Sequence, residues 1–392
     1  VCSSDLKVED MRIYFDNAAT TQPYGELTEI FQRQLTDDWF NPSAMYPPAV
    51  RMEGELNKAR RTLGEIINAR PDEVYFNSGG SEGANTVWHT GYRRQGGRKL
   101  HFVTSAYEHS CVYECAKQIM QSGHDVDFIK PRKDGKIHPE DVAAKVRENT
   151  VLVSIMHVNN ETGAINDVEE IARACKKVNP KLMFHSDGVQ GFARYDINFD
   201  GSKIDYYTTS AHKLHALKGT GALFAKKGTP LKPFILGGGQ ESGMRSGTEN
   251  TLGILAFAYS AGRFHRNKNA YMRRMSEVRN YIAQRIVEIE GAKVISPEDG
   301  AAHILNISMR GLRAEVVVHA LEQHDIYIGT GSACSSKKTK GSRIHEALGL
   351  DKQTGEGAIR LSFNEKSSIA EADAFLVQVR NIHAKFAGFR RR

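Results

Sequence analysis

The sequence predicts an α/β fold, in which a large domain with a mostly parallel seven-stranded sheet precedes a smaller α+β domain. Two observations lead to this prediction. Between about residues 74 and 225, short apolar runs alternate with segments of helical periodicity, which is typical of a parallel sheet covered by helices on both faces. From about residue 250 this alternation gives way to one long helical segment and then to shorter strands and helices.

The seven strands of the large sheet are expected at apolar runs, each followed by a polar or glycine-containing segment. These runs are residues 73–77, 101–105, 126–130, 150–158, 182–187, 206–211 and 221–226. Helical patterns separate them, at 78–88, 111–120, 139–149 and 167–178. Asp167 is positioned to cap the last of these helices, because aspartate accepts hydrogen bonds from backbone N–H groups in a first helical turn.

The C-terminal third predicts a different architecture. In residues 251–290 apolar side chains recur at three- and four-residue steps, which indicates a helix that Gly291 is expected to stop. Strands are then expected at 304–309 and 358–363, and helices at 314–324 and 370–386. The predicted domains are therefore 14–258 and 259–392, with residues 1–13 packing on the smaller one.

Composition narrows the function classes. Hydrophobic residues make up 40% and charged residues 25% of the 392 residues, which is ordinary for a soluble globular protein. No apolar run approaches the roughly 18 residues needed to cross a bilayer, and no signal peptide is recognised. The net charge of +7 is spread along the chain without a nucleic-acid motif. Five cysteines in no disulfide-like spacing favour a reducing, cytoplasmic location.

Polar residues follow five of the predicted strands. Because ligands of α/β sheets bind at the carboxyl ends of the strands, these residues are expected to converge on one site. In chain order they are Gly79-Gly80-Ser81, Glu108-His109, Asn159 to Gly163, Asp187 with Gln190, and Ser210 with His212 and Lys213.

This collection suits pyridoxal 5'-phosphate. A phosphate needs N–H donors, hydroxyls and a cation, a pyridine nitrogen that stays protonated needs a carboxylate, and an aldehyde needs an amine. Asp187 would pair with the pyridine nitrogen, His109 would stack on the ring, and Lys213 would form the Schiff base. A donor to the phenolate oxygen is available from Gln190 or Asn160. The phosphate group is assigned to Gly80, Ser81, Ser210 and His212.

Segments from residue 14 to residue 363 carry a family resemblance, and they cover nearly the whole chain. They include YFDNAATT (14–21), SGGSEGAN (78–85), HVNNETGAI (157–165), HSDGVQ (185–190), TSAHKLHALKGTGAL (209–223), GGGQESGMRSGTEN (237–250), GSACSS (331–336) and IRLSF (359–363). With these motifs the sequence resembles the NifS- and IscS-like cysteine desulfurases, in the aminotransferase class V branch of the fold-type I pyridoxal-phosphate enzymes.

The resemblance implies further roles. Thr248 would reach the phosphate of a neighbouring subunit, which implies a homodimer. Arg360 and Asn41, with Asn160 as a further candidate, would hold the carboxylate of L-cysteine. Cys334 would be the nucleophile that receives sulfur as a persulfide and passes it to an acceptor protein, such as an iron–sulfur scaffold or a thiolation enzyme. The lysine-rich run at 337–340 would favour the thiolate.

The same residues are compatible with two other activities and with a metal site. Another class V enzyme, a selenocysteine lyase or an aminotransferase, is the alternative activity. A catalytically silent sulfur-relay protein is a second alternative, against which Lys213, Asp187 and His109 argue. His109, Cys111 and Cys115 could suggest a metal site, but small residues packed on a buried helix are the favoured interpretation. No metal is therefore expected.

Overall fold

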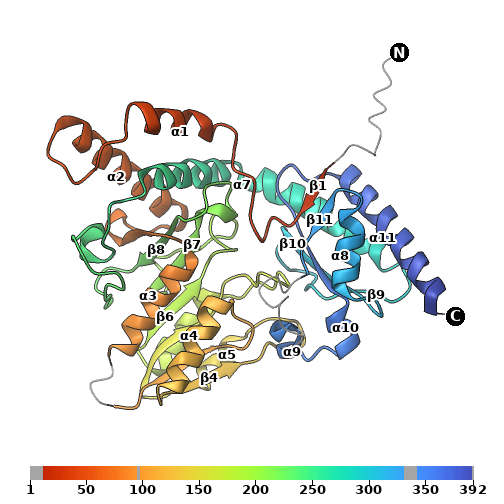
Figure 1. Ribbon diagram of the computed structural model, residues 1–392. Helices are drawn as coiled ribbons and strands as arrows, with labels where there is room; N and C mark the ends of the chain where they lie inside the picture. Colours follow the sequence, from red (N-terminus) through yellow and green to blue (C-terminus); the bar gives the residue numbers. More distant parts are fainter. Residues whose placement is uncertain (1–11, 95–97, 331–341, 391–392) are drawn as a thin grey trace. The chain divides into compact units, whose positions relative to one another are not determined.

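The computed structural model describes residues 12–94, 98–330 and 342–390 (Figure 1). The chain forms two compact units. Among the described residues, the larger comprises 21–94, 98–159 and 165–268, and the smaller comprises 12–20, 160–164, 269–330 and 342–390. The sequence-based division at 258/259 stays a prediction. The compact units differ from it because the long helix α7 (Thr251–Ile286) contributes residues to both.

The larger unit contains a seven-stranded sheet. Its order is β2 (Val74–Asn77), β8 (Gly221–Ala225), β7 (Tyr206–Ser210), β6 (Met183–Asp187), β5 (Thr150–Ser154), β3 (His101–Ser105) and β4 (Asp125–Ile129). β8 runs antiparallel to both of its neighbours, and the other pairs are parallel. This confirms the predicted mostly parallel sheet of seven strands.

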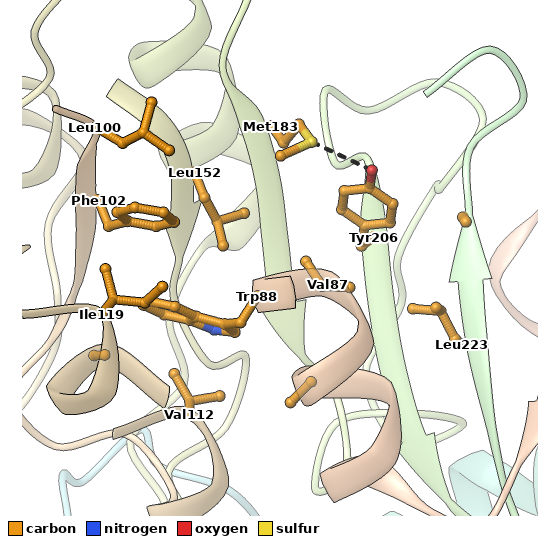
Figure 2. Packing of buried hydrophobic residues seen from close by; sticks show 13 residues of the cluster. Val87, Trp88, Leu100, Phe102, Val112, Ile119, Leu152, Met183, Tyr206 and Leu223 are labelled. Atoms are coloured by element: carbon orange, nitrogen blue, oxygen red, sulfur yellow. Dashed lines mark hydrogen bonds between the residues drawn. The ribbon is translucent and has the colours of Figure 1, made fainter. Parts of the chain in front are cut away.

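Helices α3 (Gly80–Tyr92) and α4 (Ser110–Gln121) pack on this sheet through a hydrophobic cluster (Figure 2). Trp88 of α3 stacks on Phe102 of β3 with ring centroids 5.5 Å apart and an interplanar angle of 11°. Val112 and Ile119 of α4 complete the contact, and all four side chains are buried. Because both helices begin just after a strand, this apolar contact fixes the position of their N-terminal turns.

The remaining helices of the larger unit are α1 (Leu27–Thr36), α2 (Pro47–Ile67), α5 (Pro139–Ala143) and α6 (Val168–Val178). Asp167 caps α6 as predicted, since its side chain accepts a hydrogen bond of 3.0 Å from the N–H of Glu170. No helix in the described part of the chain is long and apolar enough to span a membrane.

The smaller unit has the predicted α+β character. β10 (Ile304–Met309) lies between β12 (Ala358–Ser362) and β9 (Ala292–Val294), antiparallel to both, and β1 (Ile13–Phe15) pairs in parallel with β11 (Ile326–Ile328). Its helices are α8 (Ala314–Glu322), α9 (Arg343–Ala347), α10 (Lys352–Glu356) and α11 (Ile369–Arg390), together with the end of α7.

Three predicted elements are shorter in the structure. The helix expected over 139–149 ends at Ala143, because residues 144–149 form turns whose bonds include Thr150 N–H to Arg147 O. The strand expected over 150–158 ends at Ser154, although Val158 still makes an isolated bridge with Ile165. The long helix ends at Ile286, before the expected stop, and Gly291 follows with a φ of 76°.

Candidate active site

Asp187, the last residue of β6, holds a buried carboxyl group that is only 5% exposed. Its Oδ1 accepts a hydrogen bond of 3.0 Å from the N–H of Val189. Burial raises the pKa of Asp187, and the positive charges of His109 and Lys213 act in the opposite direction. The structure therefore brings together three residues that the sequence assigned to one site.

Close packing fixes the backbone beside this carboxyl group. A methyl group on Gly188 would lie 2.0 Å from the ring of Tyr207, so only glycine fits here. The Tyr207 hydroxyl is 2.9 Å from Nδ1 of His157, and burial lowers the pKa of His157 to about 4. The sequence analysis gave no role to Tyr207 or His157. The glycine that directly follows Asp187 in the sequence was the available signal.

His109 precedes α4 and caps it. Its Nδ1 accepts a hydrogen bond of 3.2 Å from the N–H of Cys111, and the Cys111 sulfur lies 3.1 Å from the same nitrogen. One ligand atom each of His109, Cys111 and Asp187 lie within 4.8 Å of one another. Cys115 instead donates to Asn85 Oδ1 at 3.3 Å. The predicted absence of a metal stays a prediction. His109, Cys111 and Asp187 are the described residues whose ligand atoms are close enough to hold one.

Lys213 follows β7 at the end of a short 3-10 turn, Ala211–Lys213. The turn is held from two directions. Nη2 of Arg194 donates to the Lys213 carbonyl at 2.6 Å, and the N–H of Thr21 donates to the His212 carbonyl at 3.0 Å. Because these bonds use only carbonyl oxygens of the turn, its backbone is positioned without occupying the lysine amine.

His212 departs from the predicted role of a cation. Burial, together with the positive charges of Lys213 and Lys218, lowers the pKa of His212 to about 4. At neutral pH the imidazole of the cofactor-free chain is therefore uncharged, and its contact with the phosphate stays a prediction. The sequence could not reveal the uncharged state, because the shift depends on burial.

The first turn of α3 carries the other residues assigned to the phosphate. Gly79, with a φ of 145°, leads into the helix, and a methyl group on Gly80 would lie 2.5 Å from Cγ2 of Val189. Gly80 therefore lies directly against the turn that follows Asp187. The Ser210 hydroxyl oxygen would be 3.5 Å from a Cβ built on Gly79, so Ser210 and the helix start are adjacent. Unpaired N–H groups in a first helical turn favour an anion.

Thr248 lies in the segment 237–250, which is hydrogen-bonded to the edge strand β2 of the sheet through Glu241. Glu241 accepts hydrogen bonds of 2.6 Å from Arg60 Nη1 and 2.8 Å from the N–H of Phe76 in β2. Thr248 itself is exposed and lines a cavity of about 200 Å³, together with Ser78, Gly219 and Asn250. The cavity thus places the threonine at the same end of β2 as the start of α3.

Gln190 and Asn41 also belong to the larger unit. Gln190 is buried in the turn that follows β6. Asn41 is exposed, and its Oδ1 accepts a hydrogen bond of 2.9 Å from the N–H of Ser43. Their predicted roles at the phenolate and at the substrate carboxylate stay predictions. Cys334 and the lysines of 337–340 lie outside the described residues.

In the smaller unit Arg360 projects from β12 and is 4% exposed. Its Nη2 donates to Asp16 Oδ1 at 2.7 Å, and its Nη1 donates to the carbonyl of Asn160 at 2.9 Å. Within the described part of the chain, the buried Nε of Arg360 and Oδ1 of Asn160 have no hydrogen-bond partner. Unsatisfied buried polar groups are costly, so these atoms suit a polar ligand. The sequence analysis missed Asp16, although it lies in the YFDNAATT motif.

Glu161, next to Asn160, is a buried carboxyl group. It accepts a hydrogen bond of 2.8 Å from the Ser342 hydroxyl, which in turn accepts from the N–H of Ile344 and caps α9. Burial raises the pKa of Glu161 to about 7, although the Ser342 bond and the charges of Arg360 and Arg343 oppose the shift.

Comparison with known proteins assigns the family. The model of the family described as aminotransferase class V matches residues 13–375. The chain therefore belongs to the aminotransferase class V family, whose members include pyridoxal-phosphate enzymes.

Its relatives narrow the assignment. A "NifS/IcsS protein homolog" of Lactobacillus delbrueckii subsp. bulgaricus is 36% identical over 96% of this chain and 98% of its own length. The "Cysteine desulfurase IscS" of Clostridium botulinum strain Hall is 32% identical, with 93% and 92% covered. A solved structure titled "NIFS-LIKE PROTEIN" is 30% identical and superposes with a TM-score of 0.89, covering 95% of this chain and all of that one. Within the family, the chain groups with the NifS- and IscS-like cysteine desulfurases.

The Glu161 carboxyl group predicts a pH-dependent stability. Because its folded pKa of about 7 exceeds the ordinary 4.5, the folded chain holds a proton that the unfolded chain has lost between these values. The contribution of the protonated Glu161 to the free energy of unfolding is present in full below pH 4.5 and is lost as the pH rises to about 7. The free energy of unfolding of the wild type, relative to Glu161→Gln, should fall by up to ~3 kcal/mol over this range. Denaturant unfolding at a series of pH values measures it.

Glu148→Gln, at an exposed position, is the matched control for loss of one carboxylate. A difference between wild type and Glu161→Gln that stays level, or that grows with pH, would contradict the prediction.

Proposed function

We propose that this chain is a pyridoxal-phosphate-dependent cysteine desulfurase that converts L-cysteine to L-alanine and stores the sulfur as a persulfide on Cys334. The observation that carries the proposal is the buried Asp187 carboxyl group, which interacts with His109 and Lys213 at the carboxyl ends of the sheet strands. Family membership and the cysteine desulfurase names of the relatives support the same activity.

The described residues fit the cofactor. A buried carboxyl group with a raised pKa is stabilised by a cationic partner, and a protonated pyridine nitrogen is such a partner. When bound, pyridoxal phosphate supplies an electrophilic carbon and a ring that accepts electron density from the substrate Cα. We assign the ring to Asp187, His109 and Gln190 and the covalent link to Lys213. The phosphate is assigned to Gly80, Ser81, Ser210, His212 and the Thr248 of a neighbouring subunit.

Substrate recognition is assigned to the smaller unit and to Asn41. Arg360 is already oriented by Asp16 and by the Asn160 carbonyl, while its Nε remains available as a buried donor among the described residues. A charge-assisted hydrogen bond from a guanidinium to the cysteine carboxylate is stronger than one between neutral groups. Preorganisation of this kind lowers the conformational entropy lost on binding.

Lys213 and His109 carry out the proton transfers, and Cys334 carries out the sulfur transfer. The Lys213 amine takes the Cα proton of the substrate, and His109 takes the proton of its thiol. The thiolate of Cys334 attacks the substrate sulfur and a sulfur–sulfur bond forms. The carbon–sulfur bond breaks and its electron pair stays with the substrate Cβ. Cβ then takes the proton held by His109 and Cα regains the proton held by Lys213, which completes alanine and leaves the persulfide on Cys334.

Partners and location follow from the same proposal. The persulfide requires a protein acceptor, for which an iron–sulfur scaffold or a tRNA-thiolation enzyme is suitable. The role given to Thr248 requires a homodimer. A cytoplasmic location is supported by Cys111, Cys115 and Cys175, which are free thiols in the structure.

The covalent link provides a direct test of the cofactor assignment. Borohydride reduction of the purified protein should attach pyridoxal phosphate to the peptide that contains Lys213, as identified by peptide mass mapping. Lys213→Ala should lose the attachment, while Lys218→Ala, five residues further on at an exposed position, should retain it. Attachment to another lysine would sink the assignment.

The sulfur step is tested at Cys334. With L-cysteine and a reductant, wild type should form alanine and sulfide in equal amounts, because each cleaved carbon–sulfur bond yields one of each. Cys334→Ser should reduce both by more than about 100-fold, as expected for removal of a nucleophile. Cys115→Ser is the control. Amino-group transfer that persists in Cys334→Ser would favour an aminotransferase instead.

Arg360→Lys tests the carboxylate contact. Lysine retains the charge but loses the planar set of donors, so the KM for L-cysteine should rise about tenfold or more while the Lys213 attachment is unchanged. Arg380→Lys, an exposed arginine of the same unit that pairs with Glu288, is the matched control. Equal KM values for the wild type and Arg360→Lys would refute the contact.

A further inference from the structure

The cluster of His109, Cys111 and Asp187 combines three kinds of metal ligand. An imidazole, a thiol and a carboxyl group each offer one ligand atom, and these atoms lie within 4.8 Å of one another. Zinc accepts these three ligand types and leaves a fourth position to water when only three protein ligands are present. The mixture of nitrogen, sulfur and oxygen donors favours a borderline cation such as Zn²⁺ over Mg²⁺ or Ca²⁺.

Its geometry is close to that of a zinc site. Zinc bonds of ~2.0–2.3 Å place tetrahedral ligand atoms roughly 3.3–3.8 Å apart. The sulfur of Cys111 is 3.1 Å from Nδ1 of His109, slightly closer than two ligands of one zinc ion, so these two side chains need to separate by only a few tenths of an ångström. The Asp187 oxygen lies within 4.8 Å of the other two ligand atoms. His109 and Cys111 are half-buried at the start of α4, and Asp187 is buried at the end of β6. All three residues therefore belong to regular elements of the fold.

Two of the three ligands are residues that the proposed function gives to the cofactor. Asp187 cannot pair with a ring nitrogen while it ligates a metal, and a His109 nitrogen that ligates a metal cannot accept a proton from the substrate thiol. Zinc and pyridoxal phosphate would therefore exclude each other at this position. Cys111 has no part in the proposed sulfur transfer, so it distinguishes metal binding from catalysis.

We propose that the cofactor-free chain binds Zn²⁺ through His109, Cys111 and Asp187, and that the bound ion blocks loading of pyridoxal phosphate. Metal binding stands on the cluster alone, whereas the blocking of the cofactor rests on the proposed function. On binding, the Cys111 thiol releases its proton to solvent and the metal exchanges bound water for the three side chains.

Cobalt(II) is the probe for the metal site, because thiolate-bound Co²⁺ gives a sulfur-to-metal charge-transfer absorption. The full chain carrying Cys334→Ser, which removes the other site thiol, is freed of cofactor by dialysis against hydroxylamine and titrated with Co²⁺. An equimolar amount should produce the charge-transfer band. Adding Cys111→Ser should abolish the band, and adding Cys115→Ser should leave it. Absence of the band, its survival without Cys111 or its loss without Cys115 would overturn the site.

Asp187→Asn provides an independent variant that keeps the thiol. It should weaken Co²⁺ binding by more than about tenfold while retaining sulfur ligation, and unchanged affinity would remove Asp187 from the ligand set. Circular dichroism of each variant shows whether it is folded before titration.

Cofactor loading tests the exclusion. The same cofactor-free chain is given pyridoxal phosphate with and without an equimolar amount of Zn²⁺, and the absorbance of the protein-bound cofactor is followed. Zinc should slow loading by about tenfold or more, and Cys111→Ser should remove the effect. Equal loading with and without zinc would refute the exclusion. If no cofactor binds even without zinc, the proposed function fails, and the cobalt titration still decides the metal site.

Discussion

The buried carboxyl group of Asp187 is the constraint on which the arrangement of this site depends. An isolated carboxylate in an apolar interior is unstable, and here it is compensated by His109 and Lys213, which follow two other strands. Only a parallel sheet delivers the ends of non-adjacent chain segments to one edge in this way. The same fold therefore buries the carboxyl group, which raises its pKa, and places beside it two positive charges that partly offset the burial.

The packing behind this carboxyl group leaves little freedom. Gly188 lies flat against the ring of Tyr207, and Tyr207 is held by the neutral imidazole of His157. The apolar cluster of Trp88 and Phe102 fixes the helices whose first turns face the same edge. Two kinds of interaction thus position the site: apolar contacts place the helix N-termini, and buried hydrogen bonds orient the polar groups.

Sequence patterns predicted the seven strands, and they also predicted that Asp187, His109 and Lys213 come together, because strand-end polar residues and glycine-rich turns are local features. They failed where the outcome depends on distant residues. Asp16 and Arg360 meet only because β1 and β12 belong to the same unit, and no local pattern connects them. The neutral state of His212 follows from burial and neighbouring lysines. The short helix α5 and the early end of α7 show the same limit, since residues beyond those ends make turn hydrogen bonds that periodicity alone does not reveal.

The antiparallel direction of β8 has a consequence for how the lysine is held. Ser210 at the end of β7 and Gly221 at the start of β8 are register partners. The connection that carries Lys213 therefore begins and ends at directly paired residues of the sheet. The strand pairing thus fixes the two ends of this connection relative to each other. Residues added at the exposed positions 218 and 219 would enlarge the connection without shifting the register of either strand, because the free energy of loop closure grows only slowly with length. The exposed part of this connection can therefore vary in length while the backbone that carries Lys213 keeps its place at the end of β7.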